Sequence, residues 1–368
     1  SALGPVVREY LVSEAMHALG VPTTRALAAV TTGEAVQRDE PRPGGILARV
    51  ARSHVRVGTF QYFAARRDLD SLRRLIDHVI ERLYPEAAAA DAPVEAVLGS
   101  VAEAQAALVA QWLGLGFVHG VMNTDNMSIA GETIDYGPCA FMEAYDPNAV
   151  WSSIDRRGRY AYSNQPPIAQ WNLARFAETL LPLIDDGDEQ AAIERATAAL
   201  QRFAPAFESA WLATMRAKLG LIEAGDDDAA LIQALLDAMH AGGADFTLTF
   251  RHLADAVDPG REAGELRAAL RDPAALDAWL PDWRARLARE GREPGDVAAA
   301  MRAVNPALIP RNHRVEEAIR AAEDDEDFSV FHRLREAWCR PFQPRAGDRD
   351  LLRPAQSGER VTTTFCGT

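Results

Sequence analysis

The segment with the richest chemistry covers residues 117–142 and reads FVHGVMNTDNMSIAGETIDYGPCAFM. Asp125 and Asn126 stand side by side in it, and Asp135 follows nine residues after Asn126. The stretch between them, MSIAGETI, is typical of a tight hairpin that turns at Ala130–Gly131. Such a hairpin would bring the Asn126 amide and the Asp135 carboxylate together, and oxygen groups of these kinds bind Mg²⁺ beside nucleotide phosphates. The pattern therefore predicts a divalent-metal site that holds a nucleotide.

Protein kinases arrange a comparable site as a catalytic-loop Asn, a short hairpin and then Asp-Phe-Gly. Here Asp135-Tyr136-Gly137 stands in the place of that triplet. A kinase loop also reads His-Arg-Asp, whereas Gly120 and Val121 follow His119, so the usual catalytic Asp is absent and Asp125 is the nearest carboxylate. Taken alone, the run NTDN would more often be an ordinary polar turn. Its spacing to Asp-Tyr-Gly favours the nucleotide site.

The elements around this segment follow from hydrophobic periodicity and from turn residues. Residues 5–19 predict a helix, and two strand-like runs follow, joined by a polar loop rich in Pro and Gly. The rest of the chain is mainly helical. The expected strands cover 26–32 and 45–58, and the expected helices cover 68–84, 94–113, 169–184, 190–220 and 228–241. This order predicts an α+β protein and suits the later part of a kinase N-lobe that runs into a helical C-lobe.

Bulk composition excludes several classes of protein. The net charge is −14, from 39 Lys+Arg against 53 Asp+Glu, which argues against wholesale binding to nucleic acid or anionic lipid. No run of eighteen apolar residues suggests a membrane span, and the first residues do not form a signal peptide. The three cysteines, Cys139, Cys339 and Cys366, are too few for a disulfide framework. We therefore expect a cytoplasmic, bacterial protein.

HGVMNTDNMSI followed by TIDYGPCAFM resembles the signature of the selenoprotein O (YdiU) family. Similar stretches occur at 8–27, 49–64, 171–178 and 303–312 and in the C-terminal CGT. The resemblance implies a bilobal, protein-kinase-like fold, with residues 1–66 as the remaining part of the N-lobe and 67–368 as the helical C-lobe. It also implies transfer of AMP from ATP to Ser, Thr or Tyr hydroxyls of target proteins. In this family ATP binds inverted relative to a kinase, and UMP transfer from UTP is ascribed to some members.

The same resemblance assigns roles to single residues. Asp125 corresponds to the general base, and Asn126 and Asp135 correspond to the ligands of Mg²⁺ or Mn²⁺. Arg49 and Arg56 correspond to arginines that hold the ATP phosphates in the inverted orientation. That role suits them, because a guanidinium group grips phosphate oxygens in pairs and keeps its charge.

Glu9 corresponds to the helix glutamate that forms an ion pair with an N-lobe lysine. That lysine and a glycine-rich phosphate loop are expected upstream of Ser1, and the chain has neither; Lys218 is its one lysine. Activity of this stretch by itself is therefore in question. The resemblance further implies a disulfide between Cys139 and Cys366, which would join the C-terminal tail to the segment that follows Asp-Tyr-Gly.

Three other functions remain open from the residues. A true protein kinase would move the γ-phosphate, but the missing His-Arg-Asp carboxylate and the pair Arg49 and Arg56 speak against it. A nucleotide-binding pseudokinase scaffold would have no need for Asp125, Asn126 and Asp135 together. A helical interaction protein without a nucleotide would leave 117–142 unexplained.

Overall fold

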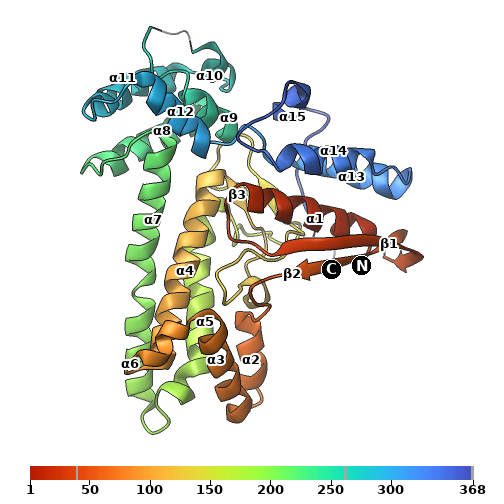
Figure 1. Cartoon of the computed structure of the whole chain (residues 1–368), viewed down its shortest axis with the longest axis vertical. Helices are drawn as coiled ribbons and strands as arrows, with labels where there is room; N and C mark the ends of the chain where they lie inside the picture. The colour runs from red at the N-terminus through yellow and green to blue at the C-terminus, as the bar shows by residue number, and fades with distance from the viewer. Residues whose placement is uncertain (39, 261–262, 366–368) are drawn as a thin grey trace.

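The computed structural model describes residues 1–38, 40–260 and 263–365 as a helix-rich α+β protein with small sheets (Figure 1). Helix α1 (Leu3–Ala18) packs on a hairpin of strands β1 (Arg25–Gln37) and β2 (Pro41–Val50). The strands are antiparallel, with Arg25 opposite Val50 and Gln37 opposite Pro41. The predicted helix at 5–19 and the hairpin are therefore confirmed.

The predicted bounds of the strands were wrong at both ends. Much of the expected loop is strand, because β1 resumes its pairing at Ala35 after an irregularity that follows Thr31. Gly33, with φ of 72°, supplies the left-handed backbone within that irregularity. The expected second strand ends early, because the chain leaves the sheet after Val50 and enters a new helix at Val57.

Helices form the body that carries residues 117–142. They are α2 (Val57–Ala64), α3 (Leu69–Leu83), α4 (Pro93–Leu115), α5 (Gln165–Ile184), α6 (Glu189–Leu200) and α7 (Phe203–Lys218). Helix α4 is central and packs against α5, α6 and α7. By length and apolar composition α4 could cross a membrane, but 67% of the stretch that satisfies this test is buried inside the protein. The predicted helices at 68–84, 94–113 and 169–184 are confirmed.

The single helix predicted at 190–220 was wrong. The chain turns between α6 and α7, which lets both helices pack against α4. Arg202 at this turn binds Glu103 of α4 through its Nε, 2.8 Å from the carboxylate. A helix-long hydrophobic pattern cannot reveal such a turn, because the pattern continues through it and a tertiary contact holds the bend.

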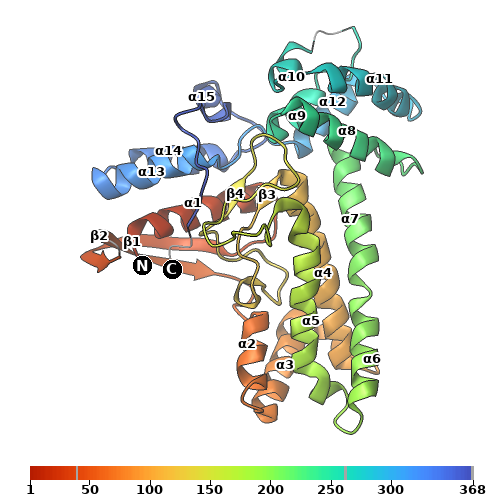
Figure 2. The same cartoon turned by 180° about the vertical axis from the view of Figure 1, so that it is seen from behind.

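A second helical layer follows α7 and has its own apolar core around Phe250 and Trp283. Its helices are α8 (Asp228–Gly242), α9 (Phe246–Leu253), α10 (Gly264–Ala268), α11 (Ala274–Ala288) and α12 (Pro294–Val304). The chain then passes back beside its N-terminal helix. Helices α13 (Asn312–Asp324) and α14 (Ser329–Trp338) pack against α1, and α15 (Arg349–Leu352) follows (Figures 1 and 2).

The ends of segment 117–142 are joined by a short antiparallel strand pair. Strand β3 (Phe117–Val118) pairs with β4 (Ala140–Phe141), so residues 119–139 form one loop anchored at both ends. Phe117 and Phe141 pack edge to face beneath that loop, with ring centroids 5.3 Å apart. The loop is therefore mounted on a rigid apolar base.

Candidate active site

The turn predicted at Ala130–Gly131 is present, and Gly131 adopts a left-handed φ of 69°. The two arms of the turn do not pair with each other, however. Ser128 forms a bridge with Arg56, and Thr133 forms one with Thr23. The loop is thereby tied on one side to the start of α2 and on the other to the entry of β1, which sets the positions of the groups at its ends.

Asn126 and Asp135 present oxygen atoms suited to a divalent cation. The Asn126 side chain donates from Nδ2 to the Val121 carbonyl at 3.0 Å, which leaves Oδ1 as its free acceptor among the described residues. Asp135 lies in the left-handed region with φ of 70°, and its Oδ1 accepts from the Gly137 N–H at 3.2 Å. A non-glycine residue in this conformation costs about 1–3 kcal/mol, and such strain is concentrated at functional sites.

The Asn126 amide and the Asp135 carboxylate are groups of the kind that bind a metal shared with a nucleotide. Within the described ranges, no group of three or more His, Cys, Asp or Glu side chains could hold a metal ion. An Asn and an Asp are the usual protein share for Mg²⁺ or Mn²⁺ when phosphate oxygens and water complete the shell. The donor set therefore matches a nucleotide-bound cation and does not match a structural zinc site.

Asp125 lies at the exposed tip of the loop, in a 3₁₀ turn at Thr124–Asn126. Its N–H donates to Asn123 Oδ1 at 3.0 Å, and its carbonyl accepts from Arg56 Nη1 at 3.0 Å. Its carboxylate rests directly over Gly58 in the first turn of α2, where a Cβ atom would lie 2.0 Å from Oδ1. Asp125 is exposed to solvent, and its carboxylate can occupy this place because residue 58 is glycine.

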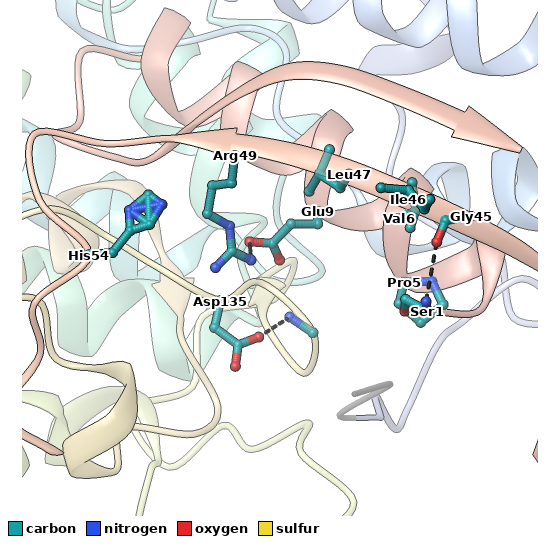
Figure 3. A pocket seen from close by; sticks show the side chains of 11 residues that line it. Ser1, Pro5, Val6, Glu9, Gly45, Ile46, Leu47, Arg49, His54 and Asp135 are labelled. Carbon is teal, nitrogen blue, oxygen red and sulfur yellow. Dashed lines mark hydrogen bonds and ion pairs between the residues drawn. The ribbon is translucent and has the colours of Figure 1, made fainter. Parts of the chain in front are cut away.

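A cavity of about 440 Å³ opens beside the loop (Figure 3). Its lining includes Glu9 from α1, Arg49 from β2, His54 and Asp135. The Glu9 and Arg49 side chains point toward each other and form an ion pair, with Asp135 close by (Figure 3). Glu9 also accepts from the Tyr136 N–H at 2.7 Å, so it contacts the residue next to Asp135.

Burial raises the pKa of Glu9, whose exposure is 7%, while Arg49 and the Tyr136 N–H oppose that rise. The ionised form of Glu9 therefore depends on these two partners. The lysine predicted to pair with Glu9 was expected upstream of Ser1, so its role stays a prediction; among the described residues Arg49 pairs with Glu9. Arg49 still lines the cavity. Arg56 does not line it and lies with Asp125 at the start of α2.

His119, which had no assigned role in the sequence analysis, holds the loop together. It is fully buried, and burial lowers its pKa. Its Nδ1 accepts from the Val121 N–H at 3.4 Å, so the other ring nitrogen, Nε2, donates to the Ile134 carbonyl at 2.9 Å. A neutral imidazole thus connects the start of the loop to the residue before Asp135.

Two further loop contacts could not be predicted from the motif. Asn172 of α5 donates to the Met122 carbonyl at 2.9 Å, and Gln165 accepts from the His119 N–H at 3.0 Å. Both side chains are fully buried. A polar residue at a core-facing position of a helix is the only sequence signal for such a role, because a buried amide needs a partner.

The predicted Cys139–Cys366 disulfide lies outside the described residues, because Cys366 does. Cys139 itself is buried, and burial raises the pKa of its thiol to about 12. The tail reaches this region: Thr364 pairs with Ser152 and donates from its hydroxyl to the Pro138 carbonyl at 2.5 Å. The C-terminal tail therefore touches the residue before Cys139.

Comparison with known proteins decides the family. A family model described as "Protein adenylyltransferase SelO" matches residues 2–338, nearly the whole chain. The chain belongs to the SelO family. SelO relatives at high identity are named "Protein nucleotidyltransferase YdiU". One from Rhizobium johnstonii is 55% identical over 368 residues, which are all of this chain and 73% of the relative. Another from Rhodopseudomonas palustris strain BisB5 is 58% identical over 368 residues, again all of this chain and 75% of the relative.

The SelO match covers both groups of residues described above. Glu9, Arg49 and Asp135 meet at the cavity, whereas Asp125 and Arg56 meet beside it at the start of α2. Asn126 follows Asp125 in the chain and is not among the residues that line the cavity. The predicted site residues of this SelO chain therefore form two groups, one at the cavity and one at the start of α2.

Proposed function

We propose that this chain supplies the catalytic residues of a metal-dependent protein adenylyltransferase that moves AMP from ATP to a protein hydroxyl. The observation that carries the proposal is the cavity at which Asp135 meets the Glu9–Arg49 ion pair. Membership of a family described as protein adenylyltransferases supports the class of reaction. The acceptors we propose are Ser, Thr and Tyr side chains, and UTP is the alternative donor in this proposal.

On the nucleotide side, Asn126 and Asp135 would hold Mg²⁺ or Mn²⁺, which supplies positive charge to the phosphates. The Glu9 carboxylate engages one end of the Arg49 guanidinium, and the remaining N–H groups can donate to phosphate oxygens in the cavity. Arg56 lies closer to Asp125 and would contact the phosphate that faces the acceptor. These contacts would bind ATP with its α-phosphate toward the exposed loop tip.

On the acceptor side, Asp125 is the general base. Its exposed carboxylate takes the proton from the incoming hydroxyl, whose oxygen then forms a bond to the α-phosphorus. The bond from that phosphorus to the bridging oxygen of the β-phosphate breaks, and pyrophosphate leaves. The neutral His119 and the buried Asn172 hold the loop from beneath. The loop that carries the Asp125 carboxylate is therefore already ordered before the reaction begins, which lowers the entropic cost of the step.

The wider organisation follows the same proposal. Residues 1–66 would form the remaining part of a kinase-like N-lobe and 67–368 a helical C-lobe, with the cavity where α1 and β2 meet the loop. We propose a cytoplasmic location. We also propose the Cys139–Cys366 disulfide, which the contact between Thr364 and Pro138 supports by bringing the tail to the residue before Cys139.

Two substitutions in the full-length protein test these roles. Asp125→Asn should lower turnover by about 10²–10⁴-fold while ATP binding persists, as loss of one acid–base group does. Asp135→Ala should abolish metal-dependent ATP binding together with AMP transfer. Asp91→Asn, at an exposed position far along the chain from the loop, is the matched control. If Asp125→Asn lost ATP affinity but kept its turnover, or if Asp135→Ala stayed active, the proposed roles would be refuted.

A further inference from the structure

Helix α1 is held from two sides. One side faces β1, β2 and the cavity, and the other is covered by α13 and α14, which return from the far end of the chain (Figures 1 and 2). On the covered side, Tyr10 of α1 packs edge to face on Phe331 of α14, with ring centroids 5.3 Å apart. The C-terminal helices are therefore direct neighbours of the helix that carries Glu9.

Charged contacts join α1 to α13 at two points. Arg8, whose side chain is 7% exposed, forms an ion pair with Glu316. Near the start of α1, the Gly4 N–H donates to Glu323 Oε1 at 2.7 Å, which satisfies one of the unpaired N–H groups of the first helical turn. A Cβ at Gly4 would lie 2.8 Å from that oxygen and 3.0 Å from Ile319, so a larger residue here would displace these side chains of α13.

Arg8 and Glu9 are consecutive, and successive side chains of a helix point about 100° apart. Arg8 therefore reaches α13 while Glu9 reaches Arg49 and the Tyr136 N–H. Helix α1 thus contacts α13 through Arg8 and contacts the site through Glu9.

We propose that Glu316 and Glu323 are positioning residues for the nucleotide site: by holding α1, they keep Glu9 against Arg49 and against the backbone beside Asp135. This inference rests on the roles proposed above for Glu9 and Asp135. It makes the C-terminal helices part of the catalytic apparatus, although neither contributes a side chain to the cavity lining.

The physical reason lies in the burial of Arg8. Without Glu316, a nearly buried guanidinium loses its carboxylate partner, and an uncompensated buried charge is strongly unfavourable. Rotation or displacement of α1 would let Arg8 reach water. The same movement would pull Glu9 from its partners, because the two residues share one rigid helix. Loss of the pair should therefore appear at the nucleotide site.

The experiment measures AMP transfer from ATP in the presence of Mg²⁺ by the full-length protein, with kcat and the KM for ATP determined separately. Glu316→Ala should lower kcat/KM for ATP by roughly twofold to thirtyfold, the span found for residues that couple to a site without touching its ligand. Glu316→Gln, which keeps a hydrogen-bond acceptor for Arg8, should lose less. Asp324→Ala is the matched control, because Asp324 carries an exposed carboxylate in the same helix.

Two readouts separate positioning from general destabilisation. All assays are run well below the melting temperature of every variant, and amide hydrogen exchange of residues 3–18 should rise in Glu316→Ala. The double variant Arg8→Met/Glu316→Met should recover most of the activity, since replacing both members of a buried pair with apolar side chains is often neutral.

If Glu316→Ala and Glu316→Gln both keep the kcat/KM of the control, or if the double variant is no better than Glu316→Ala, the inference is overturned. Asp135→Ala is measured in the same series. Retained activity in Asp135→Ala would instead overturn the proposed site. An inactive Asp135→Ala beside unchanged Glu316 variants would reject the positioning role alone.

Discussion

Gly58 offers a way to displace the proposed base without touching it. The residue lies in the first turn of α2, and its φ is not in the left-handed region, so alanine can adopt the same backbone. The added Cβ would lie 2.0 Å from Asp125 Oδ1, whereas real Cβ contacts essentially never fall below 3.0 Å. The carboxylate must therefore move by at least about 1 Å, and a shift of that size at a reacting group costs roughly 10²-fold in rate.

Stability should not fall with the activity. Alanine in place of a helical glycine stabilises by roughly 0.5–1 kcal/mol, and the atom that must yield is the end of a side chain that is open to solvent. We therefore expect Gly58→Ala to melt at or near the wild-type temperature, to bind ATP normally, and to transfer AMP about a hundredfold more slowly. Gly295→Ala is the matched control: Gly295 also lies in the first turn of a helix, and a Cβ there meets no atom within 4 Å.

The assay is single-turnover transfer of AMP, with thermal unfolding and ATP titration on the same samples. The double variant Gly58→Ala/Asp125→Asn adds a second check. If Gly58→Ala acts through the carboxylate, the double variant should be no slower than Asp125→Asn, because both changes remove the same group. Full activity in Gly58→Ala would refute the reasoning, and so would a double variant that shows the product of the two losses.

Three other predictions follow from particular residues. Burial lowers the pKa of Lys218 to about 7 in the folded protein, from 10.5 in the unfolded chain. Between these two pH values the unfolded state binds one more proton than the folded state. The free energy of unfolding should therefore rise with pH over this range. Relative to Lys218→Met in chemical denaturation, this rise should be roughly 5 kcal/mol, and equal pH profiles would contradict it. Under reducing conditions, a maleimide should label exposed Cys339 quickly and buried Cys139 only after unfolding, as peptide mass mapping would show; equal rates would exclude the buried thiol. Arg49→Lys and Arg56→Lys keep the charge but lose the guanidinium fork, so AMP transfer should fall in both variants, and unchanged transfer in both would remove their proposed phosphate contacts.

Helices and turns could be predicted where the residue pattern fits one kind of secondary structure alone. Helix α3 buries Leu72, Ile76, Val79 and Leu83 at helical spacing, so its period was visible in the sequence. The turn at Gly131 was also predictable, because a glycine between two apolar stretches is a strong turn signal. In the structure Gly131 adopts the left-handed backbone that favours glycine. The spacing of the loop motif also pointed to the right segment.

Contacts between distant parts of the chain could not be predicted in this way. Arg8 and Glu316 are separated by 308 positions, and each alone is an ordinary helix charge. The ion pair between Glu9 and Arg49 was also not predicted, because it depends on the packing of β2 against α1. The turn between α6 and α7 is likewise set by packing on α4. Pairings of this kind depend on the tertiary arrangement, which local periodicity does not encode.

The central claim is that this SelO protein transfers the adenylyl group of ATP to protein. The most direct test incubates the full-length protein and Mg²⁺ or Mn²⁺ with ATP labelled either on the α-phosphate or on the γ-phosphate, and then measures the label bound to protein. We expect stable incorporation from α-labelled ATP, release of the γ-label as pyrophosphate, and loss of both in Asp135→Ala. Incorporation of the γ-label with none of the α-label would instead show a phosphoryl transferase and exclude adenylyl transfer.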